Sequence, residues 1–186
     1  MSGSAGTGTG THRTRARRVA PATTRVRSAS IERTRALGEA LGALLAAGEV
    51  ILLVGDLGAG KTALTQGIGA GLGVRGVINS PTFTILKEYT GRLPLYHFDL
   101  YRIDSPDEVY TLGFEDYFEG DGVSVVEWAE RGEPQESGAP LPWPANYLRI
   151  ELHAEGPDAR LLVVTSAGPR GAELQAAFAR ASAEEL

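Results

Sequence analysis

The sequence contains no cysteine, which excludes disulfide bonds and metal sites built on thiolates. Its three histidines, His12, His97 and His153, show no spacing typical of metal ligands. No apolar run reaches the roughly 20 residues that a membrane-spanning helix needs, so we expect no membrane partner. What remains is a chain of 186 residues, a length that suits one domain with an ordinary core.

Acidic residues are absent from residues 1–30, which carry six arginines and almost no large apolar side chains. Such a segment cannot bury enough surface to offset its ordering entropy, so we predict a disordered Arg-rich arm. A solvated tail is the favoured interpretation, and a weak contact with RNA is the alternative. The rest of the chain carries 12 basic and 23 acidic groups. This acidic balance argues against tight unaided binding to nucleic acid, and we expect no DNA partner.

A phosphate-binding motif is the most informative stretch of the chain. Residues 55–62 read Gly-Asp-Leu-Gly-Ala-Gly-Lys-Thr, which fits the pattern GxxxxGK(S/T). Five apolar residues before the motif predict a buried strand, and apolar residues at positions 64, 68 and 72 predict a helix after it. A strand, a glycine-rich loop and a helix are the context that the motif requires. The motif therefore predicts nucleotide binding, although it does not define a reaction.

Each part of the motif has a physical role. Gly58 and Gly60 accept backbone angles that a Cβ forbids, so the main chain can approach an anion closely. The N–H groups of the loop and the positive end of the helix then converge on phosphate oxygens. Lys61 would reach the β- and γ-phosphates, and the Thr62 hydroxyl would ligate Mg²⁺. The residues predicted to bind the nucleotide are Gly55, Asp56, Leu57, Gly58, Ala59, Gly60, Lys61, Thr62, Ala63 and Glu130.

Helices and strands are expected to alternate along residues 31–168, which we predict to form one domain. Ser30 is a candidate N-cap for a helix that runs to about Ala47, and residues 105–108 are a capping box that opens a short helix. Residues 169–186 are expected to be a tail with a loose helix. The predicted strands are 50–54, 83–89, 94–100, 123–126, 147–153 and 160–165. We predict an α/β fold, a three-layer sandwich of the P-loop NTPase type with a mixed sheet and a C-terminal antiparallel hairpin.

Two acidic residues follow predicted strands and are candidates for the chemistry of a P-loop enzyme. Glu127 follows the apolar run 123–126, and Asp99 follows residues 95–98. A P-loop enzyme needs an acid at the end of a neighbouring strand to hold Mg²⁺ or the water bound to it. For each residue, the alternative is an ordinary carboxylate at the end of a strand.

Three further side chains have both a functional and a structural interpretation. Thr82 follows the loop by about 20 residues, where nucleotide switches place a hydroxyl that senses the γ-phosphate, but the segment can also be a simple proline turn. His97 is a candidate general base, although a packed and hydrogen-bonded histidine is the favoured interpretation. Trp128 either stacks on a base or belongs to the core.

Four motifs occur together in this chain. They are Gly-Asp-Leu-Gly-Ala-Gly-Lys-Thr (55–62), Ser-Pro-Thr-Phe-Thr (80–84), Tyr-His-Phe-Asp-Leu-Tyr-Arg (96–102) and Val-Glu-Trp (126–128). In this order and at this spacing they resemble the TsaE family, also called YjeE, of bacterial ATPases for threonylcarbamoyladenosine synthesis on tRNA. The resemblance covers residues 31–168, and the last three motifs are far more specific than the phosphate loop.

The resemblance implies a cytoplasmic protein that binds ATP and Mg²⁺, hydrolyses ATP weakly alone and works with the proteins TsaB and TsaD. TsaD transfers a threonylcarbamoyl group to the adenosine beside the anticodon, and ATP turnover by TsaE is thought to reset the complex between cycles. The chain would then meet tRNA only indirectly, through the complex. The resemblance also implies that Thr62 and Glu127 ligate the metal, that Asp99 acts in hydrolysis and that Thr82 is switch-like.

Two positions depart from the family pattern. Ala63 stands where the family commonly has a second threonine, which should tune nucleotide affinity, and Phe83 stands where tyrosine is usual. The Arg-rich arm is not part of the pattern either.

Three other functions are weighed against an ATPase: a small-molecule kinase, a GTPase and a nucleotide-gated binding module. The region 83–127 offers a kinase little room for a lid, and no Asn-Lys-x-Asp motif is present for guanine recognition.

Overall fold

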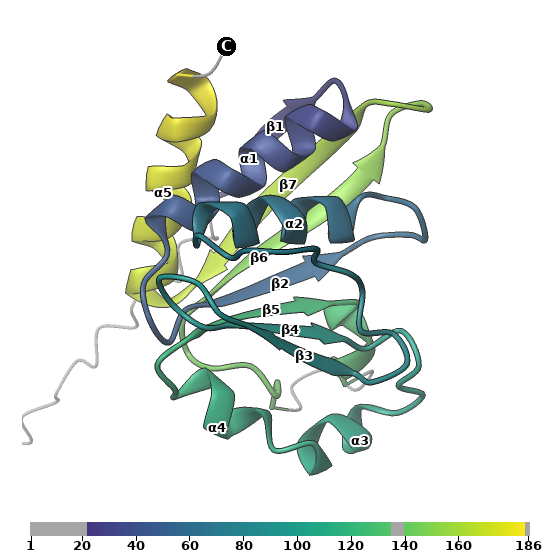
Figure 1. Ribbon diagram of the computed structural model, residues 1–186. Coiled ribbons are helices and arrows are strands. Elements are labelled where there is room, and N and C mark those ends of the chain that lie inside the picture. The colour runs from purple at the N-terminus through teal and green to yellow at the C-terminus, as the bar shows by residue number, and fades with distance from the viewer. Residues whose placement is uncertain (1–21, 135–139, 185–186) are drawn as a thin grey trace, which may run out of the picture.

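The computed structural model describes residues 22–134 and 140–184, and within them a seven-stranded sheet carries helices on both faces (Figure 1). The strands are β1 (Thr24–Ser28), β2 (Val50–Val54), β3 (Leu86–Tyr89), β4 (Leu95–Asp99), β5 (Val123–Glu127), β6 (Tyr147–Ala154) and β7 (Arg160–Ala167). The helices are α1 (Ile31–Leu44), α2 (Lys61–Gly71), α3 (Pro106–Thr111), α4 (Phe114–Phe118), α5 (Gly168–Glu184) and the 3-10 helix η1 (Ala129–Gly132). Among these described helices, none is long and apolar enough to cross a membrane.

The sheet has the strand order β1-β7-β6-β2-β5-β4-β3. The four central strands β6, β2, β5 and β4 are parallel, whereas the pairs β1–β7, β6–β7 and β3–β4 are antiparallel. The predicted mixed sheet is therefore confirmed, as is the antiparallel hairpin near the C-terminus. Because β4, β2 and β5 run in the same direction, their carboxyl ends meet at one edge of the sheet, which is where α/β proteins bind ligands.

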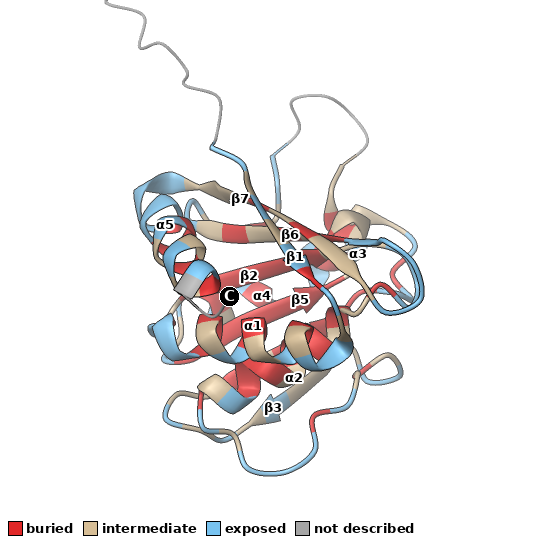
Figure 2. Ribbon diagram, turned by 90° about the horizontal axis from the view of Figure 1, so that it is seen from above, coloured by how far each residue is buried: buried red, intermediate tan, exposed pale blue. Residues whose placement is uncertain are grey.

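Two apolar cores lie on opposite faces of the sheet, and β2 contributes to both. Ile51 and Leu53 point into the core beneath α1, α2 and α5, while Val50 and Leu52 point into the core beneath α3 and α4. The alternation follows from the period of two along a strand. Figure 2 shows the central strands β2 and β5 buried between these layers. This arrangement confirms the predicted three-layer α/β sandwich.

Helices α1 and α2 pack with their backbones in close approach, because glycines face each other at the crossing. A Cβ added at Gly38 would lie 2.4 Å from the carbonyl oxygen of Leu64, and one added at Gly67 would lie 2.0 Å from that of Arg35. Gly42 and Gly71 repeat the pattern one turn further along. Side chains at these positions would force the helices apart. The glycines thus fix α2, the helix that follows the phosphate-binding motif, against α1.

The prediction of a disordered arm over residues 1–30 is wrong for its last part. Residues 24–28 form β1, which pairs antiparallel with β7 at the edge of the sheet. Val26 packs against the core, and the buried Ser28 hydroxyl is 2.8 Å from that of Thr34. The period of two explains the error: inward Thr, Val and Ser alternate with outward Arg, and the average composition hides this pattern. The predicted disorder of residues 1–21 lies outside the described residues.

The predicted C-terminal tail is a 17-residue helix, α5, whose Leu174 and Phe178 are buried in the core. The buried Gln175 amide donates to the carbonyl oxygens of Ala22 and Val164 and so ties α5 to β7 and to the segment just before β1. The folded unit therefore extends from β1 to α5, beyond the predicted limits of 31–168.

Two element boundaries agree with the sequence expectations and two differ from them, each for a local reason. The Ser30 side chain caps α1 and the Ser105 side chain caps α3, as expected. Helix α1 ends at Leu44 and not at Ala47, and Arg92 donates to two carbonyls of its last turn and to the carbonyl of the C-cap residue Leu45. Strand β3 begins at Leu86 and not at residue 83, because a turn from Pro81 to Thr84 precedes it.

Candidate nucleotide-binding site

The loop of residues 55–60 connects β2 to α2 at the carboxyl edge of the parallel strands. Gly55, Gly58 and Gly60 have φ angles of +142°, +79° and +105°, which L side chains rarely adopt. Gly55 also lies close to β6, since an added Cβ would be 2.5 Å from the carbonyl oxygen of Leu152. The loop therefore takes its shape from the glycines that the motif contains.

A cleft of about 560 Å³ opens beside this loop, a volume within the range of small-molecule sites. It is bordered by α1, by the loop and the start of α2, by the segment of residues 80–82 and by the ends of β4 and β5. The residues that line it are Ile31, Arg35, Leu57, Gly58, Ala59, Gly60, Lys61, Thr62, Ala63, Gln66, Ser80, Thr82, Asp99, Tyr101, Glu127 and Trp128. Most predicted site residues thus share one cleft.

Lys61 is a buried cation at the base of the cleft. Its ammonium donates to the carbonyl oxygens of Gly55 at 2.5 Å and Asp56 at 3.0 Å, and it lies 3.5 Å from the centre of the Trp128 ring. Burial lowers the pKa of Lys61, and the nearby carboxylates of Glu127, Glu130, Asp99 and Asp56 oppose that effect. Lys61 thus brings a positive charge to the part of the cleft beside the glycine-rich loop, and Arg35 also lines the cleft.

Glu127, at the end of β5, holds three side chains together. Its Oε2 accepts from the Thr62 hydroxyl at 3.0 Å, and its Oε1 accepts from the Thr65 hydroxyl at 3.1 Å. The same Oε1 lies 2.8 Å from Nε2 of His97, which is fully buried. The structure thus agrees with the interpretation of His97 as a packed, hydrogen-bonded residue. These contacts fix the carboxylate so that one oxygen faces Thr62.

Asp99, at the end of β4, is directly opposite Glu127 in the register of the two strands. Its Oδ2 accepts from the hydroxyls of Ser80 and Thr82, the latter at 2.7 Å. Its Oδ1 accepts from the N–H of Tyr101 at 2.9 Å. The segment that contains Thr82 is therefore anchored to the strand-end acid, and both predicted catalytic residues belong to one hydrogen-bonded group.

Trp128 forms one wall of the cleft in a left-handed backbone conformation, with a φ angle of +59°. Its ring contacts that of Tyr101 with 4.9 Å between centroids, and the Arg131 guanidinium lies 5.9 Å from the indole. A non-glycine residue with positive φ is uncommon and often marks a functional site. The tryptophan thus lines the cleft with Lys61 on its ring, and its partly buried side chain also packs against the core beneath α3 and α4.

Three predicted nucleotide ligands lie outside the lining of the cleft. Gly55 and Asp56 accept from Lys61 through their carbonyl oxygens. Glu130, in η1, has a carboxylate oxygen that is buried without a hydrogen-bond partner among the described residues. Burial raises the pKa of Glu130, against the opposing effects of a hydrogen bond to its own backbone and of the Lys61 and Arg149 charges. Gly55 and Asp56 thus hydrogen-bond to Lys61, and the Glu130 carboxylate acts on the charge of Lys61, but none of the three residues lines the cleft.

Several residues that bond to the two acids were not predicted from the sequence. Ser80, Thr65 and Tyr101 each bond to one of the two acids. Ser80 stands beside the predicted Thr82, so its proximity in sequence was an available signal. Thr65 follows Lys61 by one helical turn, a spacing that places both residues on the same side of α2.

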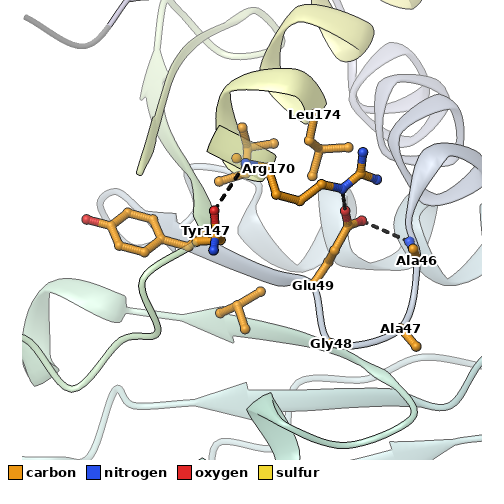
Figure 3. Close-up of a pocket in the computed structure, with 11 residues that line it drawn as sticks. Ala46, Ala47, Gly48, Glu49, Tyr147, Arg170 and Leu174 are labelled. Atoms are coloured by element: carbon orange, nitrogen blue, oxygen red, sulfur yellow. Dashed lines mark hydrogen bonds and ion pairs between the residues drawn. The ribbon is translucent and has the colours of Figure 1, made fainter. Parts of the chain in front are cut away.

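A second cavity, of about 200 Å³, lies at the opposite end of β2 (Figure 3). In it the Glu49 carboxylate accepts from Nε of Arg170 at 2.6 Å and from the N–H of Ala46 at 2.8 Å. Both carboxylate oxygens are thus engaged by the chain itself. This pair links α5 to the segment before β2, and we assign it a structural role.

Comparison with known proteins agrees with the geometry. The family model described as "Threonylcarbamoyl adenosine biosynthesis protein TsaE" matches residues 28–162. A protein from Bacillus subtilis (strain 168) named tRNA threonylcarbamoyladenosine biosynthesis protein TsaE is 44% identical over 145 residues, which are 77% of this chain and 86% of the relative. A protein of the same name from Nostoc sp. (strain PCC 7120) is 48% identical over 135 residues, 69% of this chain and 77% of the relative.

A solved structure is also similar. The crystal structure of YdiB from Bacillus subtilis superposes with a TM-score of 0.72 and 37% sequence identity, covering 87% of this chain and 97% of that one. The residues that the family model matches include the glycine-rich loop, the segment of residues 80–82 and both strand-end acids. The chain therefore belongs to the TsaE family.

Proposed function

We propose that this chain is the Mg²⁺-dependent ATPase of tRNA threonylcarbamoyladenosine biosynthesis. One observation carries the proposal: a phosphate-binding loop and two adjacent acids, Glu127 and Asp99, line the same cleft. The relatives from Bacillus subtilis and Nostoc carry the name of that pathway. A loop for phosphates accounts for ATP binding, and the acids account for the metal and for water.

ATP binding rests on the loop and on Lys61. The N–H groups of residues 58–62 and the N-terminus of α2 supply partial positive charge to the phosphates. Lys61 would donate to the β- and γ-phosphates, and its present contacts with Gly55 and Asp56 keep the ammonium at the base of the loop. Trp128 offers an aromatic wall at the same cleft.

Thr62 and Glu127 are the residues that would hold Mg²⁺. A hydroxyl and a carboxylate are hard oxygen ligands, and the two groups already lie 3.0 Å apart. No cluster of three or more His, Cys, Asp and Glu side chains capable of binding a metal occurs among the described residues, which fits an ion that keeps several waters and binds phosphates. When bound, Mg²⁺ would neutralise charge on the phosphate oxygens.

Asp99 is placed to orient the attacking water. Hydrolysis forms a bond between a water oxygen and the γ-phosphorus and breaks the bond from that phosphorus to the bridging oxygen, which leaves with ADP. The carboxylate of Asp99 accepts a hydrogen bond from the water, while Ser80 and Thr82 keep the side chain in place. Thr82 lies beside this acid and would sense the γ-phosphate.

We further propose that the chain acts in the cytoplasm on a complex of TsaB and TsaD, and meets tRNA only through that complex. Exposed apolar side chains near the cleft support a protein partner. Leu57 is 79% exposed and Phe83 is 85% exposed, so both side chains are accessible to a partner. A partner that covers Leu57 would also cover the phosphate loop.

Calorimetry with nucleotides tests the binding part of the proposal. Mg-ATP should bind the wild-type protein, and Lys61→Ala should weaken that binding about tenfold or more, because a charge-assisted contact contributes roughly 1.5–3 kcal/mol. GTP should bind more weakly than ATP. Unchanged ATP affinity in Lys61→Ala would refute the site, and equal affinities for ATP and GTP would favour the GTPase interpretation.

A turnover assay separates the enzyme from its two remaining alternatives. ATP hydrolysis should be slow for the protein alone and faster when TsaB and TsaD are added. Hydrolysis that needs a small-molecule phosphate acceptor would indicate a kinase. ATP-dependent association with TsaB and TsaD without any hydrolysis would indicate a nucleotide-gated binding module.

A further inference from the structure

Arg160, the first residue of β7, reaches across to the outer side of the phosphate-binding loop. Its Nε donates to the carbonyl oxygen of Ala59 at 2.9 Å, and its Nη2 lies 3.4 Å from that of Gly58. Its Nη1 donates to the carbonyl oxygen of Ala159 at 2.8 Å, within the turn that joins β6 to β7. One guanidinium thus connects the tip of the hairpin to a loop about 100 residues earlier in the chain.

The positive charge of this guanidinium has no carboxylate partner within residues 22–134 and 140–184. All of its acceptors are backbone carbonyl oxygens. Arginine keeps its charge at every physiological pH. A full positive charge therefore lies next to a loop that is built to face anions, and it is not cancelled by an acid.

The contact with Ala59 determines how one peptide group of the loop is oriented. In a trans peptide the carbonyl of one residue and the N–H of the next point in opposite directions. Arg160 is not part of the lining of the cleft, whereas Ala59 and Gly60 are. When the Ala59 carbonyl points out to Arg160, the N–H of Gly60 points away from Arg160 and toward the cleft. A hydrogen bond to the carbonyl also polarises the peptide and strengthens its N–H as a donor.

We propose that Arg160 is a positioning residue for phosphate binding: it holds the Ala59–Gly60 peptide with its N–H toward the phosphates and adds positive charge behind the loop. The inference rests on the proposed function, because it needs phosphates in the cleft. It adds the β6–β7 hairpin to the site, a part of the chain that the phosphate-binding motif does not contain.

Pyrophosphate and ADP test this role, since both place phosphates in the loop and pyrophosphate has no adenine. Arg160→Met keeps the apolar stem and removes the guanidinium, and Arg160→Lys restores the charge without the planar fork. The matched control is Arg27→Met, because Arg27 is exposed on the neighbouring strand β1 and bonds to Glu155 of the same turn. Calorimetry gives the affinities, and NMR follows the Gly60 amide as pyrophosphate is added.

We expect Arg160→Met to lower the affinity for both pyrophosphate and ADP about tenfold. Arg160→Lys should recover part of the lost affinity, and Arg27→Met should bind both ligands as the wild type does. The shift of the Gly60 amide on saturation with pyrophosphate should be smaller in Arg160→Met. A variant with wild-type affinities and a wild-type Gly60 shift would overturn the inference, even if its melting temperature were lower. If Arg160→Met does not fold, Arg160→Lys with undiminished affinity and an unchanged Gly60 shift overturns it. A wild-type protein that binds neither ligand would refute the proposed function itself, and this role with it.

Discussion

Under the proposed function, Lys61 serves phosphate binding at the expense of stability. The ammonium is buried, and burial lowers its pKa below the usual 10.5 although four carboxylates lie near enough to oppose the effect. When a group binds its proton more weakly in the folded state than in the unfolded state, the protonated group lowers the free energy of unfolding. Such a conflict between stability and activity is common at binding sites.

A pH prediction follows for Lys61→Met. Just below pH 10.5 the unfolded lysine still carries its proton while the folded one releases it, so this group makes stability rise with pH in that range. The nucleotide-free variant should lack that rise and should melt above the wild type at pH 7. Thermal unfolding of both proteins from pH 7 to pH 10 measures the difference. A variant that melts below the wild type at pH 7 would show that the lysine's hydrogen bonds outweigh its burial.

Glu127 allows a second prediction at the same scale. Glu127→Gln keeps the shape of the side chain and removes the charge that Mg²⁺ needs. Mg²⁺-dependent ATP binding should weaken about tenfold, and excess Mg²⁺ should restore part of it. Calorimetry at several Mg²⁺ concentrations measures the effect, with ATP in EDTA as the control that should differ little between the proteins. An identical Mg²⁺ dependence in both proteins would remove Glu127 from the metal site.

Single residues were predictable where the signal was local. Lys61 and Thr62 follow from the motif, and Asp99 and Glu127 follow from apolar runs that end in an acid. Arg160 could not be predicted, because its contact with Ala59 spans 101 residues and depends on which strands become neighbours. Thr65 could not be tied to Glu127 for the same reason, since 62 residues separate them.

At the scale of elements, the edge strand β1 shows how a regular pattern can be hidden. The alternation in β7 predicts a strand, and β1 has the same alternation, but the arginine-rich composition of residues 1–30 predicts disorder. The glycines at positions 38, 42, 67 and 71 also contain an available signal, since residues four apart in a helix share a face. Their close contact fixes α2, and with it the loop, against α1.

Truncation distinguishes β1 from the residues that precede it. Removal of residues 1–28 deletes β1, exposes the edge of β7 and removes the packing of Val26, so the melting temperature should fall by about 5 °C or more. Removal of residues 1–21 leaves β1 intact and serves as the matched control, with a melting temperature close to that of the full chain. Equal melting temperatures for the two truncated proteins would show that β1 contributes little to the fold.

At the scale of the whole molecule, the parallel centre of the sheet explains why the site exists. Strands β4, β2 and β5 bring the two acids and the loop to one edge of the sheet. The order of strands was not predictable from local patterns, because pairing joins segments far apart in sequence. The loop, by contrast, was predictable from eight consecutive residues.

The proposed function makes hydrolysis at Asp99 the contribution of this chain to tRNA modification. Asp99→Asn keeps the size of the side chain and removes the carboxylate that would orient water, so it should bind Mg-ATP nearly as the wild type does and hydrolyse it far more slowly. The decisive measurement is the number of modified tRNA molecules formed per TsaB–TsaD complex over time. With wild-type protein the number should rise through many cycles, and with Asp99→Asn it should stop after about one. Continued cycles at the wild-type rate by a variant confirmed to be unable to hydrolyse ATP would contradict the account.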